Sequence, residues 1–349
     1  MASIVFIFIL ILIHDCLCNL TLSPQSTHKL QEPSKTWSIF KKQYHRSYNE
    51  VEDSFRREIF TRNLDLISRH NIEADLGLHS FWLEVNRFAD LTNEEYRSQY
   101  LGYDGKDENE GNNTYLSNPW DIPSSLDWRL KNVLTAVKDS GECSSSWAFS
   151  AVSSVESQYA LTTGHRISLS EQQVIDCSHD FGNEGCSGGG LTTSAFKYIK
   201  SAGGIDSTDS YQFIGEDSIC KFTRQNVTAK VAGFVNVLKD DESVLKDAVA
   251  NVGPISSAVD AGSVFFQFYS RGVLDVDDCQ KEPNHAVTVV GYGVEWKDGD
   301  LSSNGTEYWI LKNSWGMKWG ENGYMKLARN QDNLCGVASQ ATYPLIQNF

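Results

Sequence analysis

The sequence is poor in proline and in basic residues, and each shortage excludes a class of protein. Only 7 of its 349 residues are proline, which leaves little room for a long proline-rich linker. Lys and Arg number 30 against 45 Asp and Glu, a formal net charge of −15, so we expect no nucleic acid or anionic membrane as partner. The histidines lack the spacing of a metal site, and we expect neither a metal nor a cofactor. The 40% of hydrophobic residues suffices for a substantial core, which excludes a disordered chain.

Long hydrophobic runs are also missing, apart from one near the first residue. Residues 4–13 read IVFIFILILI, which is too short to span a bilayer, because a spanning helix needs about 20 residues. The run has the length of a secretory signal, although no basic residue precedes it. We predict a signal peptide over residues 1–18 of a secreted or lysosomal protein, with an uncleaved anchor as the alternative, and no membrane span in the mature chain. Secretion makes glycosylation credible at three Asn-X-Thr sequences, which begin at Asn112, Asn226 and Asn304.

Of the eight cysteines, Cys16 and Cys18 lie in or beside the predicted signal. An even set of six in an oxidising compartment predicts three disulfides. The six are Cys143, Cys177, Cys186, Cys220, Cys279 and Cys335. Their spacing leaves all fifteen pairings open, but any complete pairing leaves no free thiol among them.

The chain divides at an acidic, glycine-rich stretch over residues 104–118, in which Lys106 is the only basic residue. Such a stretch cannot bury a face, so we expect an exposed, cleavable connection. We place a helical domain over residues 19–118 and a second domain over residues 119–349. Within the first, residues 33–75 are predicted to be helical, because six residues recur on one face. These are Glu52, Arg56, Phe60, Asn63, Ile67 and Asn71.

The second domain begins with helical patterns and ends with strand patterns. Residues 146–163 and 193–200 have apolar residues at helical spacing. The apolar run 286–290 and the short segments 308–311 and 324–327 are predicted strands, bounded by Gly and Asn. Helices first and strands after indicate an α+β fold rather than alternating βαβ units.

Three separated motifs carry the chemistry. They read KDSGECSSSWAFS over residues 138–150, NHAV over residues 284–287 and KNSWG over residues 312–316. Their order, spacing and flanking residues resemble those of the papain-like cysteine proteases, and within them the cathepsin L branch. The motif GCSGG at residues 185–189 is similar to the glycine motif of that family's substrate cleft. The resemblance runs from about residue 35 to the C-terminus.

The first domain resembles the inhibitory propeptide of the same branch. The six-residue helical set matches its signature, and Asn86, Phe88 and Asp90 match its second motif, although Glu84 stands where a glycine is usual. The resemblance implies a papain-like two-lobed fold, with a helical left lobe and a β-barrel-like right lobe, preceded in the chain by a helical propeptide. It implies a monomer whose cleft, with Gly188, Gly189 and Trp315, takes an extended peptide or its own propeptide. It also implies the disulfide pairs Cys143–Cys186, Cys177–Cys220 and Cys279–Cys335.

The resemblance places Ser146, His285 and Asn313 in the catalytic positions, but the family has a cysteine where this chain has Ser146. A thiol at a helix N-terminus beside an imidazole becomes a thiolate, whereas a hydroxyl must lose its proton during attack. Ser140 replaces a glutamine that helps to hold the oxyanion, and we expect its short side chain to fall short. The loss of one oxyanion donor costs about 10²–10³ in rate. Ser144 replaces the usual glycine of the same loop.

Three functions follow from these residues. The leading hypothesis is a catalytically impaired or inactive homologue that retains a peptide-binding cleft. The alternative is a silicatein-like Ser/His enzyme that condenses silicic acid, since silicateins of sponges also carry a serine in place of the cysteine. Against it, silicateins keep the glutamine where this chain has Ser140, and Trp147 is more typical of the proteases. The third is a weak serine-type hydrolase of activated esters.

Overall fold

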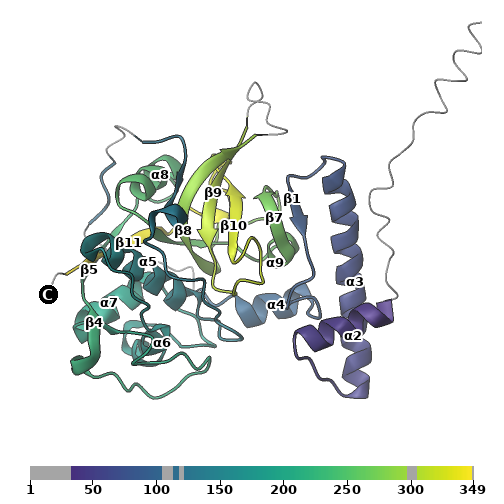
Figure 1. The fold of residues 1–349 in the computed structure, drawn as a ribbon, viewed down its shortest axis with the longest axis horizontal. Helices are drawn as coiled ribbons and strands as arrows, with labels where there is room; N and C mark the ends of the chain where they lie inside the picture. Colours follow the sequence, from purple (N-terminus) through teal and green to yellow (C-terminus); the bar gives the residue numbers. More distant parts are fainter. Residues whose placement is uncertain (1–32, 104–112, 118–121, 297–304, 348–349) are drawn as a thin grey trace, which may run out of the picture. The chain divides into compact units, whose positions relative to one another are not determined.

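The computed structural model describes residues 33–103, 113–117, 122–296 and 305–347, which form two compact units, Met1–Asn49 and Glu50–Phe349 (Figure 1). The predicted signal peptide, the sequons at Asn112 and Asn304 and most of the predicted connection lie outside the described residues. The domain boundaries after residues 18 and 118 therefore stay predictions. No helix in the described ranges is long and apolar enough to cross a membrane.

The predicted helix over residues 33–75 is two helices, so the prediction was wrong between them. They are α2 (Pro33–Gln43), in the first unit, and α3 (Glu50–Asp75), which begins the second. His45 between them has a φ of 54°, a left-handed conformation that a right-handed helix cannot contain. In the first unit the ring of Trp37 stacks on Phe40 and on Tyr48, with centroids 5.6 and 6.1 Å apart.

Residues of the six-residue set hold the segments that follow α3 against this helix. Phe60 is buried, and Asn63 donates hydrogen bonds of 2.9 Å to the carbonyls of Ala89 and Leu91. Asn71 exchanges two hydrogen bonds of 2.8 Å with the backbone of Leu83. The amide side chains therefore satisfy backbone groups of the turn over residues 87–91 and of the strand residue Leu83.

The chain then adds a strand to the sheet of the second domain. Strand β1 (Phe81–Leu83) pairs antiparallel with β7 (Tyr269–Leu274). Helix α4 (Asn93–Tyr100) follows, and a capping box between Thr92 and Glu95 closes its N-terminus, which satisfies two amides that a helix start leaves without partners. Residues 50–103 of the predicted propeptide thus belong to the same compact unit as the predicted peptidase domain.

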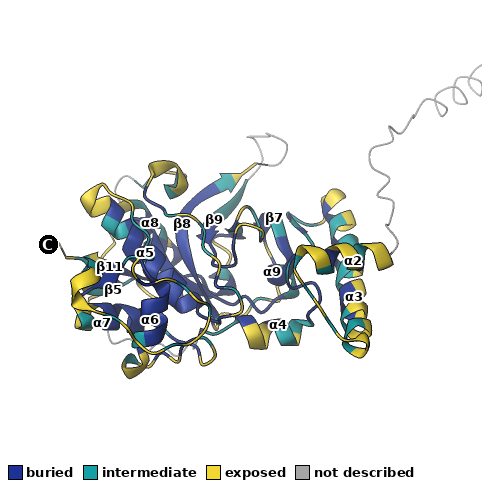
Figure 2. Ribbon diagram, turned by 60° about the horizontal axis from the view of Figure 1, so that its bottom comes forward, coloured by how far each residue is buried: buried dark blue, intermediate teal, exposed yellow. Residues whose placement is uncertain are grey.

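The helical part of the second domain is built around α5 (Ser146–Thr163), as the sequence predicted. It packs against α6 (Glu171–Cys177) and α7 (Thr192–Ala202) on one side and against strands of the sheet on the other. Thirteen of its 18 residues are buried, and Figure 2 shows the helix almost entirely in the colour of buried residues. Gly164 ends it in a left-handed conformation at φ 76°, which glycine adopts without steric cost.

The sheet has nine strands in the order β1-β7-β10-β9-β8-β6-β11-β5, with β2 beside β8. Its remaining strands are β2 (Leu126–Asp127), β5 (Val231–Asn236), β6 (Ile255–Val259), β8 (His285–Glu295), β9 (Thr306–Lys312), β10 (Tyr324–Ala328) and β11 (Thr342–Ile346). Two short strands, β3 (Ile205–Asp206) and β4 (Val227–Ala229), form a second sheet, and α8 (Glu242–Asn251) and α9 (Val264–Phe268) lie between later strands of the chain. The described residues also form short 3₁₀ helices at Trp128–Lys131, His179–Phe181, Arg224–Asn226 and Leu334–Gly336. Most helices precede most strands, which gives the predicted α+β fold.

Three disulfides connect this domain. They are Cys143–Cys186, Cys177–Cys220 and Cys279–Cys335, the pairs that the resemblance implies. Each closes a loop of 43, 43 or 56 residues, which restricts the unfolded chain and so stabilises the folded one. All six cysteines of the described part are oxidised, and the described residues therefore contain no free thiol.

Two histidines stack where α3 meets β1. The ring of His70, which is 4% exposed, lies 4.3 Å from the ring of His79 and 5.2 Å from that of Phe265. Its Nε2 bonds to the carbonyl of Phe81 at 3.1 Å, so the neutral imidazole donates there. Burial lowers the pKa of His70, and the neighbouring His79 lowers it further, against the attraction of Glu73.

The stacked pair predicts a loss of stability in acid. Because the folded state lowers the pKa of His70, the unfolded state binds more protons below about pH 6.5, and the free energy of unfolding falls as the pH drops through that range. His70→Gln keeps a donor for the Phe81 carbonyl but does not titrate. We expect denaturant unfolding between pH 7 and pH 5 to lose less stability in His70→Gln than in the parent. An equal loss in both would show that His70 contributes nothing to the acid sensitivity.

Candidate active site

Ser146 is the first residue of α5 and lies against the start of β8. It is 2% exposed, and its Oγ accepts a hydrogen bond of 3.0 Å from the backbone N–H of Ala286. The hydroxyl therefore lies next to His285, the preceding residue of β8. The register of β8 against β6 and β9 fixes this position, because α5 packs on the same strand.

The imidazole of His285 is oriented by Asn313 at the end of β9. Its Nε2 lies 2.8 Å from Asn313 Oδ1, and the same oxygen accepts the N–H of Ser314 at 2.7 Å. Since Oδ1 accepts from both, Nε2 carries the proton and Nδ1 is the bare acceptor of the neutral ring. Within the described residues Nδ1 has no hydrogen-bond partner, so no hydrogen bond joins it to Ser146.

Burial makes this imidazole a neutral group. His285 is fully buried, and the ring of Trp315 covers it at a centroid distance of 4.5 Å. Burial lowers the pKa of His285 to about 4, against the smaller opposing effect of the bond to Asn313. A neutral histidine with a bare Nδ1 can accept a proton and so act as a general base. It is not the protonated imidazolium that would pair with a thiolate.

The other residues predicted for the site surround this pair. The backbone N–H of Ser140, which is buried, donates to the carbonyl of Ser314 at 2.9 Å, so the loop before α5 is fixed to the Asn313 motif. Gly189 has a φ of 87° and is buried, whereas Gly188 is exposed. The structure thus brings Ser140, Ser146, His285 and Asn313 to one place.

A segment of the predicted propeptide lies over the site, and we call residues 99–103 the covering segment. Its Gly102 carbonyl accepts the N–H of Gly190 at 3.1 Å, and its Tyr103 N–H donates to the carbonyl of Asn284 at 3.1 Å. Gly190 follows the glycine motif on the helical side, whereas Asn284 precedes His285 on the sheet side. The covering segment therefore bridges the helical side and the sheet side of the cleft.

Further contacts hold the preceding residues of the predicted propeptide in place. The rings of Phe88 and Tyr96 meet Trp315 edge-on at 5.1 and 5.8 Å. Arg87 forms an ion pair of 2.6 Å with Asp139, the neighbour of Ser140. Phe88 belongs to the second propeptide motif of the sequence analysis, so this motif contacts the aromatic cover of His285.

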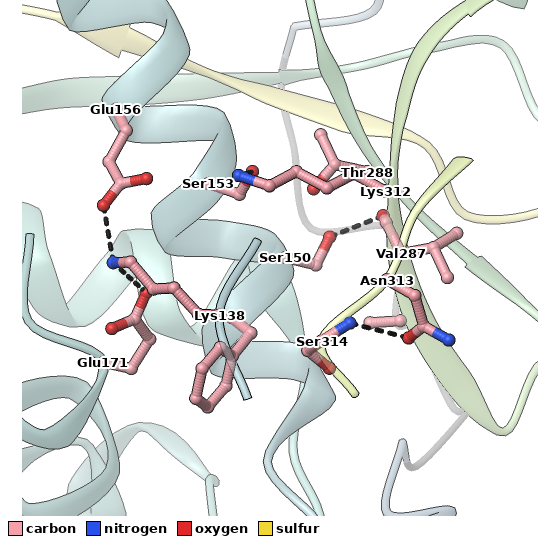
Figure 3. Close-up of a pocket in the computed structure, with 12 residues that line it drawn as sticks. Lys138, Ser150, Ser153, Glu156, Glu171, Val287, Thr288, Lys312, Asn313 and Ser314 are labelled. Atoms are coloured by element: carbon pink, nitrogen blue, oxygen red, sulfur yellow. Dashed lines mark hydrogen bonds and ion pairs between the residues drawn. The ribbon is translucent and has the colours of Figure 1, made fainter. Parts of the chain in front are cut away.

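Sequence reasoning missed a buried charge cluster behind the site (Figure 3). The Lys138 ammonium lies 2.7 Å from Glu156 of α5 and 2.6 Å from Glu171 of α6. Lys312, beside Asn313, donates to the carbonyl of Thr135 at 3.1 Å. The glutamate at residue 156 was a possible signal, because it stands in an otherwise apolar and serine-rich helix.

Burial and pairing set the charges of this cluster. Burial raises the pKa of Glu171 to about 7, against the attraction of Lys138. For Lys138 burial would lower the pKa, but the two glutamates outweigh it and raise the value. Lys312 has its pKa lowered by burial. In the described part of the chain no three His, Cys, Asp or Glu residues are placed to hold a metal ion. The ion pairs of Lys138 fix the segment before Ser140 to α5 and α6, and the bond from Lys312 to Thr135 joins that segment to the end of β9.

Comparison with known proteins gives matches over both predicted domains. Residues 122–345 match the family described as "Papain family cysteine protease", and residues 37–96 match "Cathepsin propeptide inhibitor domain". The chain is 43% identical to procathepsin L of Rattus norvegicus over 89% of this chain and 91% of that protein. It is 42% identical to digestive cysteine proteinase 3 of Homarus americanus, over 91% and 96%. The solved structure of digestive procathepsin L 3 from the larval midgut of Tenebrio molitor matches with a TM-score of 0.80 and 38% identity, over 90% of this chain and 99% of that one.

The charge cluster predicts a strong stability effect at Lys138. Lys138→Met removes the cation between Glu156 and Glu171, whose side chains are 1% and 2% exposed, and leaves two buried carboxylates without it. We expect a loss of about 3–5 kcal/mol in denaturant unfolding at pH 7.5. The control is Lys281→Met, which removes an exposed ion pair with Asp332 and should cost at most about 1 kcal/mol. Equal losses in the two variants would contradict a buried role for the cluster.

The histidine site predicts a specific tautomer. In ¹⁵N NMR of the full chain at pH 6, the His285 ring should show a protonated Nε2 and a bare Nδ1. Its titration midpoint should lie near the pKa of about 4. His285→Gln identifies the signal by its loss. A doubly protonated ring at pH 6 would refute the neutral site.

Proposed function

Because the chain belongs to the papain family of cysteine proteases, with cathepsin L-like relatives, we propose that it is a homologue of those enzymes with little or no peptidase activity. We propose that it binds extended peptide segments in its cleft without cleaving them. The observation that carries this proposal is a hydroxyl, rather than a thiol, at the start of α5 beside the His285–Asn313 pair. The second domain, residues 119–349, would act after passage through the secretory pathway, in the extracellular space or the lysosome.

The state of the histidine supports this proposal. A cysteine at residue 146 would react as a thiolate paired with an imidazolium, but a neutral His285 with a pKa lowered to about 4 must instead take the hydroxyl proton during attack. The Ser146 hydroxyl accepts from Ala286 rather than donating to Nδ1, so it is not aligned for that transfer. Asn313 orients the ring but has no charge to stabilise an imidazolium, which a carboxylate does in serine hydrolases.

The residue at the oxyanion position, Ser140, also supports the proposal of little or no peptidase activity. Ser140 stands six residues before Ser146, where the family has glutamine, and a side chain of two heavy atoms offers no amide donor. The lost donor alone accounts for about 10²–10³ in rate. Binding requires neither the thiol nor this donor, because the walls of a cleft hold a peptide backbone through their own amides and carbonyls.

A second candidate is a slow Ser/His hydrolase of activated esters, which the bare Nδ1 of His285 favours. Esters with good leaving groups need less acid catalysis than amides, so an ester is the sensitive substrate. Silica condensation by the same Ser/His pair is tested by silica precipitation with the parent and with His285→Ala.

The proposal predicts no amide hydrolysis that depends on Ser146. A fluorogenic dipeptide amide and a nitrophenyl ester are followed at pH 5 and pH 7, before and after an added protease has cut the connection over residues 104–118 and been cleared. We expect equal rates for the parent and Ser146→Ala on the amide. Amide turnover that disappears in Ser146→Ala would overturn the proposal, and ester turnover alone that disappears would select the second candidate.

A reversal experiment serves as the positive control. Ser146→Cys restores the thiol, and Ser146→Cys with Ser140→Gln also restores the oxyanion donor. We expect weak amidase activity from the first and about 10²–10³ more from the second. A folded double variant without activity would show that the loss lies elsewhere in the cleft.

A further inference from the structure

We propose that Ser144 is a peptide-binding residue of the cleft: its hydroxyl holds a backbone carbonyl of the bound segment, and its own backbone carbonyl and Cβ restrict one position of that segment to glycine. The inference rests on the proposed function, since it specifies which peptides the cleft binds. The ligand class is a peptide segment that leaves a helical turn, as the chain does at the end of α4, and has a glycine three residues after the carbonyl that Ser144 holds. The covering segment is the occupant that displays these contacts.

The first observation is a side-chain hydrogen bond across the cleft. The Oγ of Ser144, which is 8% exposed, donates to the carbonyl of Gln99. Ser144 is itself fixed, because its N–H donates to the carbonyl of Cys186 at 2.9 Å and its neighbour Cys143 is bonded to Cys186. Gln99 lies in the last turn of α4, so the hydroxyl binds one of the carbonyls that a helix C-terminus leaves without a partner, whatever the side chain at that position.

The second observation is the narrow passage at Gly102. A Cβ at this residue would lie 2.3 Å from the carbonyl oxygen of Ser144 and 2.7 Å from its Cβ. Beside Ser144, on the same helical side of the cleft, a Cβ at Gly189 would lie 2.7 Å from the Gly102 carbonyl oxygen. The backbone of the occupant therefore touches both Ser144 and the glycine motif, and any side chain larger than hydrogen at residue 102 must displace Ser144.

The third observation is the register on either side of the passage. The Gly102 carbonyl accepts from Gly190 and the Tyr103 N–H donates to Asn284, at 3.1 Å each. The Tyr103 ring is 7% exposed and packs in the hydrophobic cluster that contains Trp147. These contacts prevent the occupant from sliding, so the glycine stays opposite Ser144. The hydrogen bond from the Ser144 hydroxyl to Gln99 is the third contact that holds the same segment.

The first test uses hydrogen exchange of the full chain at the amides of Gly190 and Tyr103, whose bonds cross the cleft. Ser144→Ala should speed their exchange about fivefold, the equivalent of one ordinary hydrogen bond. Gly102→Ala should speed it by at least about tenfold, because the passage must open. Ser201→Ala, an exposed serine in the last turn of α7, is the control and should change nothing. Unchanged exchange in Ser144→Ala would overturn the role of the hydroxyl.

The second test measures binding in trans. The full chain with Gly102→Ala, in which the covering segment is loosened, is titrated with the peptide YRSQYLGY, the sequence of residues 96–103, and with its glycine-to-alanine analogue. We expect the alanine peptide to bind at least about tenfold more weakly, and Ser144→Ala to weaken the glycine peptide about fivefold. Equal affinities of the two peptides, or no binding of either, would overturn the glycine requirement.

Mass spectrometry of the recovered peptides separates this inference from the proposed function. Cleaved peptide would refute the proposed lack of peptidase activity, while the preference for glycine, read from the exchange rates of the closed chain, would stand or fall independently.

Discussion

The packing of α5 against β8 is the constraint on which the rest of the site depends. Ser150, one turn after Ser146, is buried, and its hydroxyl donates to the carbonyl of Val287 at 2.6 Å and lies 2.7 Å from the hydroxyl of Ser256. A displacement of the helix along the strand would break these bonds in a buried place, where unsatisfied polar groups are costly. The first residue of the helix is therefore held beside the first residue of β8, whatever its side chain is.

The same constraint explains how Ser146, His285 and Asn313 are kept together with a serine at the start of the helix. The positions of His285 and Asn313 come from the strands, and the ion pairs of Lys138 fix the loop before the helix. None of these contacts involves the side chain of residue 146, so fold and cleft tolerate a hydroxyl there. The chemistry differs, because a hydroxyl must give its proton to His285 during attack, and no hydrogen bond joins Ser146 to Nδ1 of that ring.

Much of this arrangement was predictable from the sequence because the residues of the site lie in short motifs that can be recognised. The helix at residue 146 has an apolar stripe and a terminal glycine, and the strand at residue 286 is a continuous apolar run between turn residues. The break between α2 and α3 was not predictable, since the helical spacing continues across a residue, His45, that takes a left-handed conformation. The charge cluster was also hidden, because its ion pairs join residues that lie 18 and 33 positions apart in the chain. The sequence of the covering segment is that of the end of a polar helix. Its fit was not predictable, because it depends on residues of the two walls of the cleft.

The covering segment gives the proposed lack of peptidase activity a further consequence. A protease that is covered by its own propeptide can uncover itself by cutting the connection, whereas under the proposed function this chain would not do so. Its cleft would then stay occupied until another protease removed the propeptide or a competing peptide displaced the covering segment. Because Ser144 adds a hydrogen bond to that segment and Gly102 fits its passage closely, displacement favours competitors that reproduce the same contacts. Ser144 and Gly102, which hold the covering segment in the cleft, would thus also determine which peptides can displace it.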